Sequence, residues 1–165
     1  MVGCLDVDTV ALRECLARLR RERRPFFLCH AELERIAQWK LEEQYGRDRR
    51  LLERLTDELV KPVSMAAFLV RDSDPDVETR VRLDVLMSLP GVGIGIASAI
   101  LALTLPETHC VVDFRGWREI FKEDREQFTV QQYLQYLHEV QGLAARLGCC
   151  TQEVDLALWQ LSRSR

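Results

Sequence analysis

The segment that most restricts the fold is Leu89-Pro90-Gly91-Val92-Gly93, which separates two stretches of helically spaced apolar residues. Before it, the spacing runs from Val81 to Leu89; after it, an apolar run continues from Ile94 to about Leu103. Proline and two glycines end the first helix, and few residues remain before the second. The sequence therefore predicts two helices joined by a tight turn, over about residues 81–104.

Each residue type in this turn has a physical role. Gly91 and Gly93 permit positive φ angles and close approach of another backbone, while Val92 fills the space between the helices. The amides of Gly91, Gly93 and Ile94 should point outward together at the start of the second helix, which suits a phosphate oxygen. The predicted DNA-binding residues of this helix-hairpin-helix pattern are Leu89, Pro90, Gly91, Val92, Gly93, Ile94 and Gly95. The alternative is a Pro-Gly turn between core helices that binds nothing.

Helical spacing extends along the rest of the chain. It predicts a first helix from about Leu5 to the arginine-rich segment before Pro25, and a break at Pro62 between two further helices. No stretch has the two-residue period of a strand, and no linker divides the chain. We expect one all-α domain over residues 1–165, with about eight to ten helices.

Four later helix ends carry capping signals. Asp113 suits the N-cap of a helix that follows the β-branched pair Val111-Val112. Thr129 and Gln132 have the spacing of a capping box. Gly148 fits a left-handed C-cap, and Thr151 is expected to cap the last helix.

Charge is distributed unevenly along a chain whose formal net charge is −3. That value gives no overall basic field for nucleic acid, so any DNA contact has to come from a local patch. The basic clusters are Arg13, Arg18, Arg20, Arg21, Arg23 and Arg24, followed by Lys40, Arg47, Arg49 and Arg50. Their alternative role is a solvated helix face and a basic loop.

The six cysteines form no C-x-x-C pair, and no spacing typical of zinc or iron–sulfur ligands occurs. We expect reduced, mostly buried thiols, and neither a metal nor a cofactor; His30, His109 and His138 are scattered. The apolar run from Ile94 to Leu105 is too short to cross a bilayer, and no cleavable apolar leader is evident. A cytoplasmic protein, associated with the nucleoid if bacterial, is the expectation.

LPGVGIGIASAIL followed by CVVDFRGWREIF resembles the helix-hairpin-helix DNA glycosylase superfamily, to which endonuclease III and 8-oxoguanine glycosylase belong. In that superfamily, a catalytic aspartate follows the last hairpin glycine by about twenty residues, and Asp113 lies twenty residues after Gly93. Cleavage of an N-glycosidic bond develops positive charge on the sugar, which a carboxylate stabilises, or it activates water. The resemblance implies that Asp113 is catalytic; N-capping alone is the other possibility.

The same resemblance limits the mechanism. Bifunctional members carry a lysine nucleophile two residues after the last hairpin glycine, where this chain has Gly95. The expected enzyme is therefore a monofunctional, base-excision-repair N-glycosylase that hydrolyses the base–sugar bond of damaged nucleotides, with no Schiff-base lyase step at residue 95. Nothing in the sequence brings Lys40 or Lys61 to that place. The gap-filling glutamine segment of many glycosylases and their four-cysteine cluster are not evident, which weakens the enzymatic interpretation.

Two further elements resemble a branch of small bacterial proteins of this superfamily: Ile36-Ala37-Gln38-Trp39-Lys40 and the segment from Val154 to Trp159. Trp39, Lys40 and Trp159 are thus candidate pocket residues, with the tryptophans stacking on a base. Core packing of both tryptophans is the alternative. Lys40 and Asp155 are either a pocket-lining pair or surface charges.

Three functions fit these observations. The first is a DNA-repair protein that contacts the phosphate backbone of duplex DNA and excises a base. The second is a DNA-binding module without enzymatic activity, and the third is a protein-interaction domain, which the net negative charge favours slightly. The lesion and the oligomeric state are left open.

Overall fold

The computed structural model describes residues 7–42 and 45–163, and every regular element in that part of the chain is a helix. The nine described helices are α1 (Val7–Glu22), α2 (His30–Leu41), α3 (Tyr45–Leu52), α4 (Asp57–Leu69), α5 (Pro75–Met87), α6 (Ile94–Thr104), α7 (Phe114–Phe121), α8 (Val130–Leu147) and α9 (Thr151–Arg163). The expected all-α class is confirmed. Leu5, the expected start of the first helix, lies outside the described residues.

Helix α6 is the buried centre of the fold. All of its residues from Ile96 to Thr104 are buried, and α1, α2 and α5 pack around it. A helix that is apolar on every side has to be covered on every side, which explains the long apolar run in the sequence. Among the described residues, no helix is long and apolar enough to cross a membrane.

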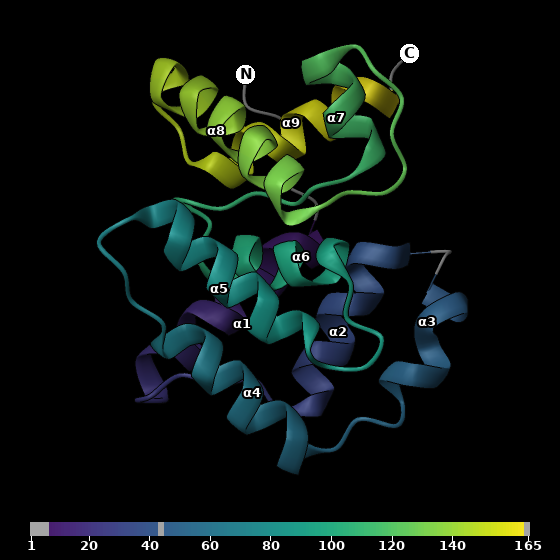
Figure 1. Cartoon of the computed structure of the whole chain (residues 1–165), viewed down its shortest axis with the longest axis vertical. Coiled ribbons are helices and arrows are strands. Elements are labelled where there is room, and N and C mark those ends of the chain that lie inside the picture. The colour runs from purple at the N-terminus through teal and green to yellow at the C-terminus, as the bar shows by residue number, and fades with distance from the viewer. Residues whose placement is uncertain (1–6, 43–44, 164–165) are drawn as a thin grey trace.

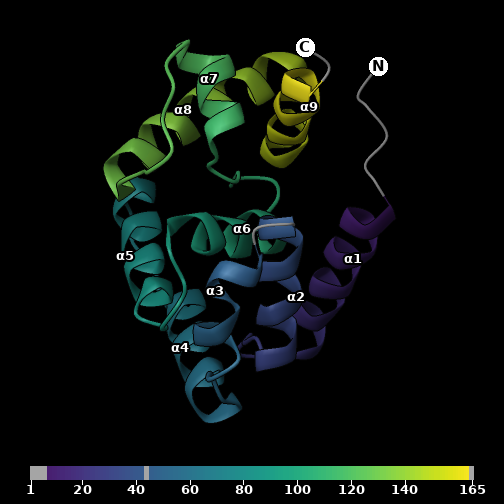
Figure 2. The same cartoon turned by 90° about the vertical axis from the view of Figure 1, so that its right-hand side faces the viewer.

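The helices form two layers (Figures 1 and 2). Helices α7, α8 and α9 form the upper layer in both views, and α1 to α6 form the lower one. The segment 105–113 passes between them, and α8 also packs against α5. Asp113, at the end of this segment, therefore lies where the layers meet.

Three predicted helix ends are confirmed. Asp113 is the N-cap of α7, Thr129 and Gln132 form a capping box at α8, and Gly148 ends α8 with φ 67°.

Three other expectations are wrong. Pro62 lies inside the continuous helix α4, because the N–H it lacks would bond only to the carbonyl of Glu58, an exposed residue of the first turn that water can reach. Thr151 is the first residue of α9 rather than its cap, since its hydroxyl donates to the carbonyl of Glu107 at 2.7 Å. Of the five described cysteines, all free, only Cys110 is fully buried.

Candidate functional site

The turn between α5 and α6 is closed by its own backbone. The amide of Leu89 donates to the carbonyl of Leu86 at 3.2 Å, and the amide of Val92 donates to the carbonyl of Leu89 at 3.0 Å. Leu89 and Val92 are both buried, so their side chains hold the turn against the core. The expected pair of helices with a tight turn is present.

The two glycines of the turn differ in what they require. Gly91 has φ +82°, and a Cβ there would lie 2.9 Å from the Cβ of Leu51 in α3, so both backbone conformation and space demand glycine. Gly93 has φ −91° and ψ −178°, an ordinary extended conformation, and a Cβ there would meet nothing within 4 Å. The expected positive φ is therefore correct for Gly91 and wrong for Gly93.

The N-terminus of α6 has no side-chain cap. Gly93 is the N-cap residue, and the first amide to bond within the helix is that of Ala97, which donates to the carbonyl of Gly93 at 2.9 Å. The amides of Ile94, Gly95 and Ile96 come before that bond and have no partner within the helix. Together with the helix dipole, they favour an anion at this end.

The two carboxylate oxygens of Asp113 have different neighbours. Oδ1 accepts a hydrogen bond from the amide of Gly116 at 2.8 Å, which caps α7. Oδ2 lies 3.6 Å from Nζ of Lys40, and the Asp113 side chain is 20% exposed. One oxygen thus caps α7, while the other faces the amine of Lys40.

Lys40 connects Asp113 to the turn. It lies in the last turn of α2, its side chain is 14% exposed, and its Cε would be 3.6 Å from a Cβ on Gly95. The structure therefore brings Lys40, Gly95 and Asp113 together from three separate segments. Lys40 pairs with Asp113 and not with Asp155, a pairing that the sequence does not reveal because no spacing relates α2 to the start of α7.

The two tryptophans proposed for the pocket have other described partners. Nε1 of Trp39 donates to the hydroxyl of Thr9 at 2.8 Å, and its ring packs against the core. The Trp159 ring lies 4.7 Å from the Arg163 guanidinium. Their role in binding a base stays a prediction.

A buried hydrogen-bond network holds the backbone of the residues that precede Asp113. Asp155 in α9 is 6% exposed; its Oδ2 accepts from the amide of Val111 at 2.9 Å, and its Oδ1 accepts from the hydroxyl of Tyr136 at 2.8 Å. Burial first, and then the charge of Asp113, raises the pKa of Asp155 to about 7. Asp155 thus fixes the backbone two residues before Asp113.

Two residues of this support were not singled out from the sequence. Ser98 of α6 accepts a hydrogen bond from the amide of Val112 at 3.2 Å and donates to the carbonyl of Gly95 at 3.0 Å. Gly116 leaves the space through which Tyr136 reaches Asp155, since a Cβ there would collide with the Tyr136 hydroxyl. A glycine among bulky residues in a short helix is the only sequence signal for this role.

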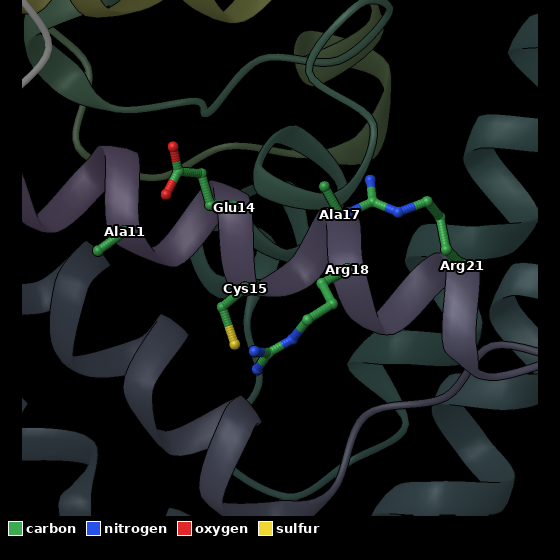
Figure 3. Close-up of a pocket in the computed structure, with 6 residues that line it drawn as sticks. All are labelled: Ala11, Glu14, Cys15, Ala17, Arg18 and Arg21. Carbon is green, nitrogen blue, oxygen red and sulfur yellow. The ribbon is translucent and has the colours of Figure 1, made fainter.

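A hollow lies elsewhere, along the outer side of α1 (Figure 3). It has a volume of about 500 Å³ and is lined by Ala11, Glu14, Cys15, Ala17, Arg18 and Arg21. It contains none of the predicted site residues. In the described part of the chain, no group of three or more His, Cys, Asp or Glu side chains could hold a metal ion.

Compared with known proteins, the chain matches no family model, no curated protein and no solved structure. Its function therefore has to be argued from the site alone.

Proposed function

We propose that the protein binds duplex DNA through the turn between α5 and α6, and that Asp113 promotes hydrolysis of the base–sugar bond of a damaged nucleotide. The observation that carries the proposal is the meeting of Asp113, Lys40 and the uncapped N-terminus of α6 at the junction of the two layers. A carboxylate beside an anion-binding helix end is what cleavage of a nucleotide requires.

The surroundings of the turn support contact with a phosphate backbone. Leu51 and Leu52 lie against Gly91, so α3 packs beside the turn, and this helix carries the exposed residues Arg49 and Arg50. Lys40 adds a third cation beside Gly95, in the first turn of α6. Contacts of this kind hold a protein on the duplex without reading its sequence.

In the proposed reaction, Oδ2 of Asp113, the oxygen that does not cap α7, faces the sugar. As the bond between the base and C1′ breaks, the base leaves with the bonding electrons and positive charge develops on the sugar, which the carboxylate stabilises. Water adds to C1′, and its proton is taken up by the carboxylate or the departing base.

The position of Lys40 favours a second candidate function. Although residue 95 is glycine, the amine of Lys40 lies beside that position and 3.6 Å from Asp113. A neutral amine there would add to C1′ of an abasic aldehyde and lose water to form an imine, after which β-elimination breaks the C3′–O bond. This activity would make the enzyme bifunctional through a different lysine.

The binding proposal is tested with the matched pair Gly93→Asp and Gly93→Asn. Both side chains fit the open space at residue 93 and can cap α6, but only aspartate brings a negative charge against a phosphate. We expect Gly93→Asp to bind a duplex at least tenfold more weakly than Gly93→Asn in fluorescence anisotropy, with affinity that falls steeply with salt for the wild type. Equal affinities would show that the turn is not the DNA contact and would favour an interaction domain.

The hydrolytic step is tested with Asp113→Asn on duplexes that each carry one damaged base. Asparagine is as good an N-cap as aspartate, so α7 should remain intact. Loss of base release with unchanged duplex affinity is the expected result. If the wild type releases no base from any duplex, hydrolysis is refuted and a binding module remains.

Borohydride trapping separates the two mechanisms. Reduction during incubation with an abasic duplex links the protein to DNA only if an imine forms, and Lys40→Met removes the amine while keeping an apolar stem beside Gly95. If the wild type forms an adduct and Lys40→Met does not, imine chemistry at Lys40, the second candidate function, is established. Base release without an adduct establishes hydrolysis alone.

A further inference from the structure

A second hollow, with a positively charged lining, lies at the opposite end of α6 from the turn. It has a volume of about 240 Å³, and its charged lining consists of Arg20, Arg23, Arg24, Arg71 and Arg82. Arg20 donates to the carbonyl of Thr104, the last residue of α6, at 2.8 Å. Since α6 has 11 residues, this arginine pocket lies roughly 16 Å from the turn, at 1.5 Å per residue.

Arg82 has a hydrogen-bond donor without an acceptor. The residue is only 6% exposed, and its Nη2 donates to Glu78 at 2.5 Å and to the carbonyl of Val70 at 3.2 Å. Its Nε is buried and has no hydrogen-bond partner among the described residues. A buried donor left without an acceptor is rare and costly, and an anion in the pocket would relieve that cost.

The pocket also carries more positive than negative charge. Glu32 pairs with Arg23 at 2.7 Å and Glu78 pairs with Arg82, but no carboxylate of the described chain lines the pocket itself. Burial lowers the pKa of Arg82, Glu78 raises it, and the charges of Arg71 and Arg20 lower it again. The guanidinium groups therefore repel one another where no counter-charge separates them.

Capping of helix ends explains only part of this cluster. Arg20 donates to the end of α6, and Arg71 donates to the carbonyls of Phe68 and Val70 at the end of α4. A guanidinium has five N–H donors, and these contacts use one or two of them. The negative ends of two helices, each worth about half a charge, and two carboxylates offset only part of five positive charges.

We propose that the arginine pocket binds a phosphate group, as inorganic phosphate or a phosphate monoester. The guanidinium fork matches phosphate oxygens in pairs, which favours phosphate over a spherical anion. Phe26 and Phe68, with ring centroids 4.7 Å apart, provide an apolar wall for a small organic group. The volume is below that of most pockets for drug-sized ligands, about 300–1,000 Å³, so the ligand is small or is the end of a strand.

The test uses inorganic phosphate and no duplex, so its outcome is independent of the proposed DNA function. Phosphate should raise the thermal unfolding midpoint saturably, beyond sodium chloride of equal ionic strength. Arg24→Gln and Arg71→Gln alter exposed residues and should each weaken phosphate binding tenfold or more in calorimetry. Arg18→Gln, on α1 outside the pocket, should change it less than twofold.

Two results would overturn the proposal. One is a phosphate effect no larger than that of chloride, and the other is an equal loss of affinity in Arg18→Gln. The source of the phosphate is identified with single strands that carry either a 5′-phosphate or a 5′-hydroxyl. If the protein prefers the strand with the 5′-phosphate and Arg71→Gln abolishes this preference, the ligand is the end of a strand. If the protein binds phosphate without this preference, the ligand is a small phosphorylated compound.

Discussion

Gly116 lies in α7 at the point where the side chain of Tyr136 passes the backbone to reach Asp155. Its need for glycine is one of space, because its φ is not among the positive ones and a side chain would meet the tyrosine hydroxyl. Tyr136 is itself fully buried, so it has little room to move aside. The hydrogen bond that keeps the buried Asp155 satisfied therefore depends on this one glycine.

We predict that Gly116→Ala lowers the free energy of unfolding by about 2–4 kcal/mol, through overpacking and loss of the Tyr136–Asp155 hydrogen bond. Helix propensity alone predicts the opposite, a gain of about 1 kcal/mol. The control is Gly142→Ala, at an exposed position in α8 with nothing within 4 Å, which should gain about 0.5–1 kcal/mol. Urea denaturation measures both, and equal gains would contradict the proposed crowding.

At this scale, the sequence predicted two residues whose role is local, although it wrongly assigned a positive φ to Gly93. Gly91 and the N-cap Asp113 follow from turn and capping chemistry within a few residues. Lys40 beside Asp113 and Tyr136 beside Asp155 depend on how helices far apart in the chain pack, and no residue spacing encodes that.

Among the elements, α6 is linked to the segment before Asp113 by one side chain. Ser98 is fully buried, and its hydroxyl accepts from the amide of Val112 while donating to the carbonyl of Gly95. The same side chain thus holds the first turn of α6 and the backbone next to Asp113.

Removal of this hydroxyl in Ser98→Ala should destabilise the protein by about 1–3 kcal/mol, because a buried amide loses its acceptor. Ser88→Ala is the matched control: Ser88 is exposed and donates to Val85 of its own helix, so its loss should change stability by less than about 0.5 kcal/mol. Thermal or urea unfolding measures the difference. Similar values for the two variants would show that Ser98 is not a link between the elements.

Helical spacing predicted the kind of element throughout the chain, since an apolar stripe that faces a core is a strong signal. It failed where the decision depended on solvent or on a distant carbonyl. Pro62 lies inside α4, where Glu58, the residue whose carbonyl it leaves without a helical partner, is exposed. The hydroxyl of Thr151 donates to the carbonyl of Glu107 and does not cap α9. The central position of α6 could not be predicted from the sequence of any single helix, because it depends on the contacts of α6 with α1, α2 and α5.

Over the whole molecule, two buried groups make stability depend on pH in opposite directions. Asp155 has a pKa raised from 3.8 to about 7, so the folded state keeps a proton that the unfolded chain loses, and stability falls as the pH rises from about 4 to 7. Burial lowers the pKa of His109 from 6.5 to about 4, so stability falls as the pH decreases from about 6.5 to 4. At 1.36 kcal/mol per pKa unit, these effects are on the order of 4 and 3 kcal/mol and largely cancel.

We therefore expect that a substitution of Asp155 reveals the pH dependence due to His109, and that a substitution of His109 reveals the pH dependence due to Asp155. Asp155→Asn mimics the protonated carboxyl and leaves only the effect of His109, so the free energy of unfolding of this variant should increase with pH between 4 and 6.5. His109→Gln leaves only the effect of Asp155, so its free energy of unfolding should decrease as the pH rises from about 4 to 7. Unfolding midpoints at several pH values measure both slopes, with the exposed Asp124→Asn as control. A slope for Asp155→Asn equal to that of the wild type would refute the assignment.

Asp113 is the N-cap of α7 in the upper layer and Lys40 belongs to α2 in the lower one, so their ion pair crosses the boundary between the layers. The buried apolar residues of both layers belong to one continuous hydrophobic core, so the layers are packed together around this ion pair. The distance between this carboxylate and this amine therefore reports on the packing of the two layers, and a substitution that loosens their shared core should lengthen it.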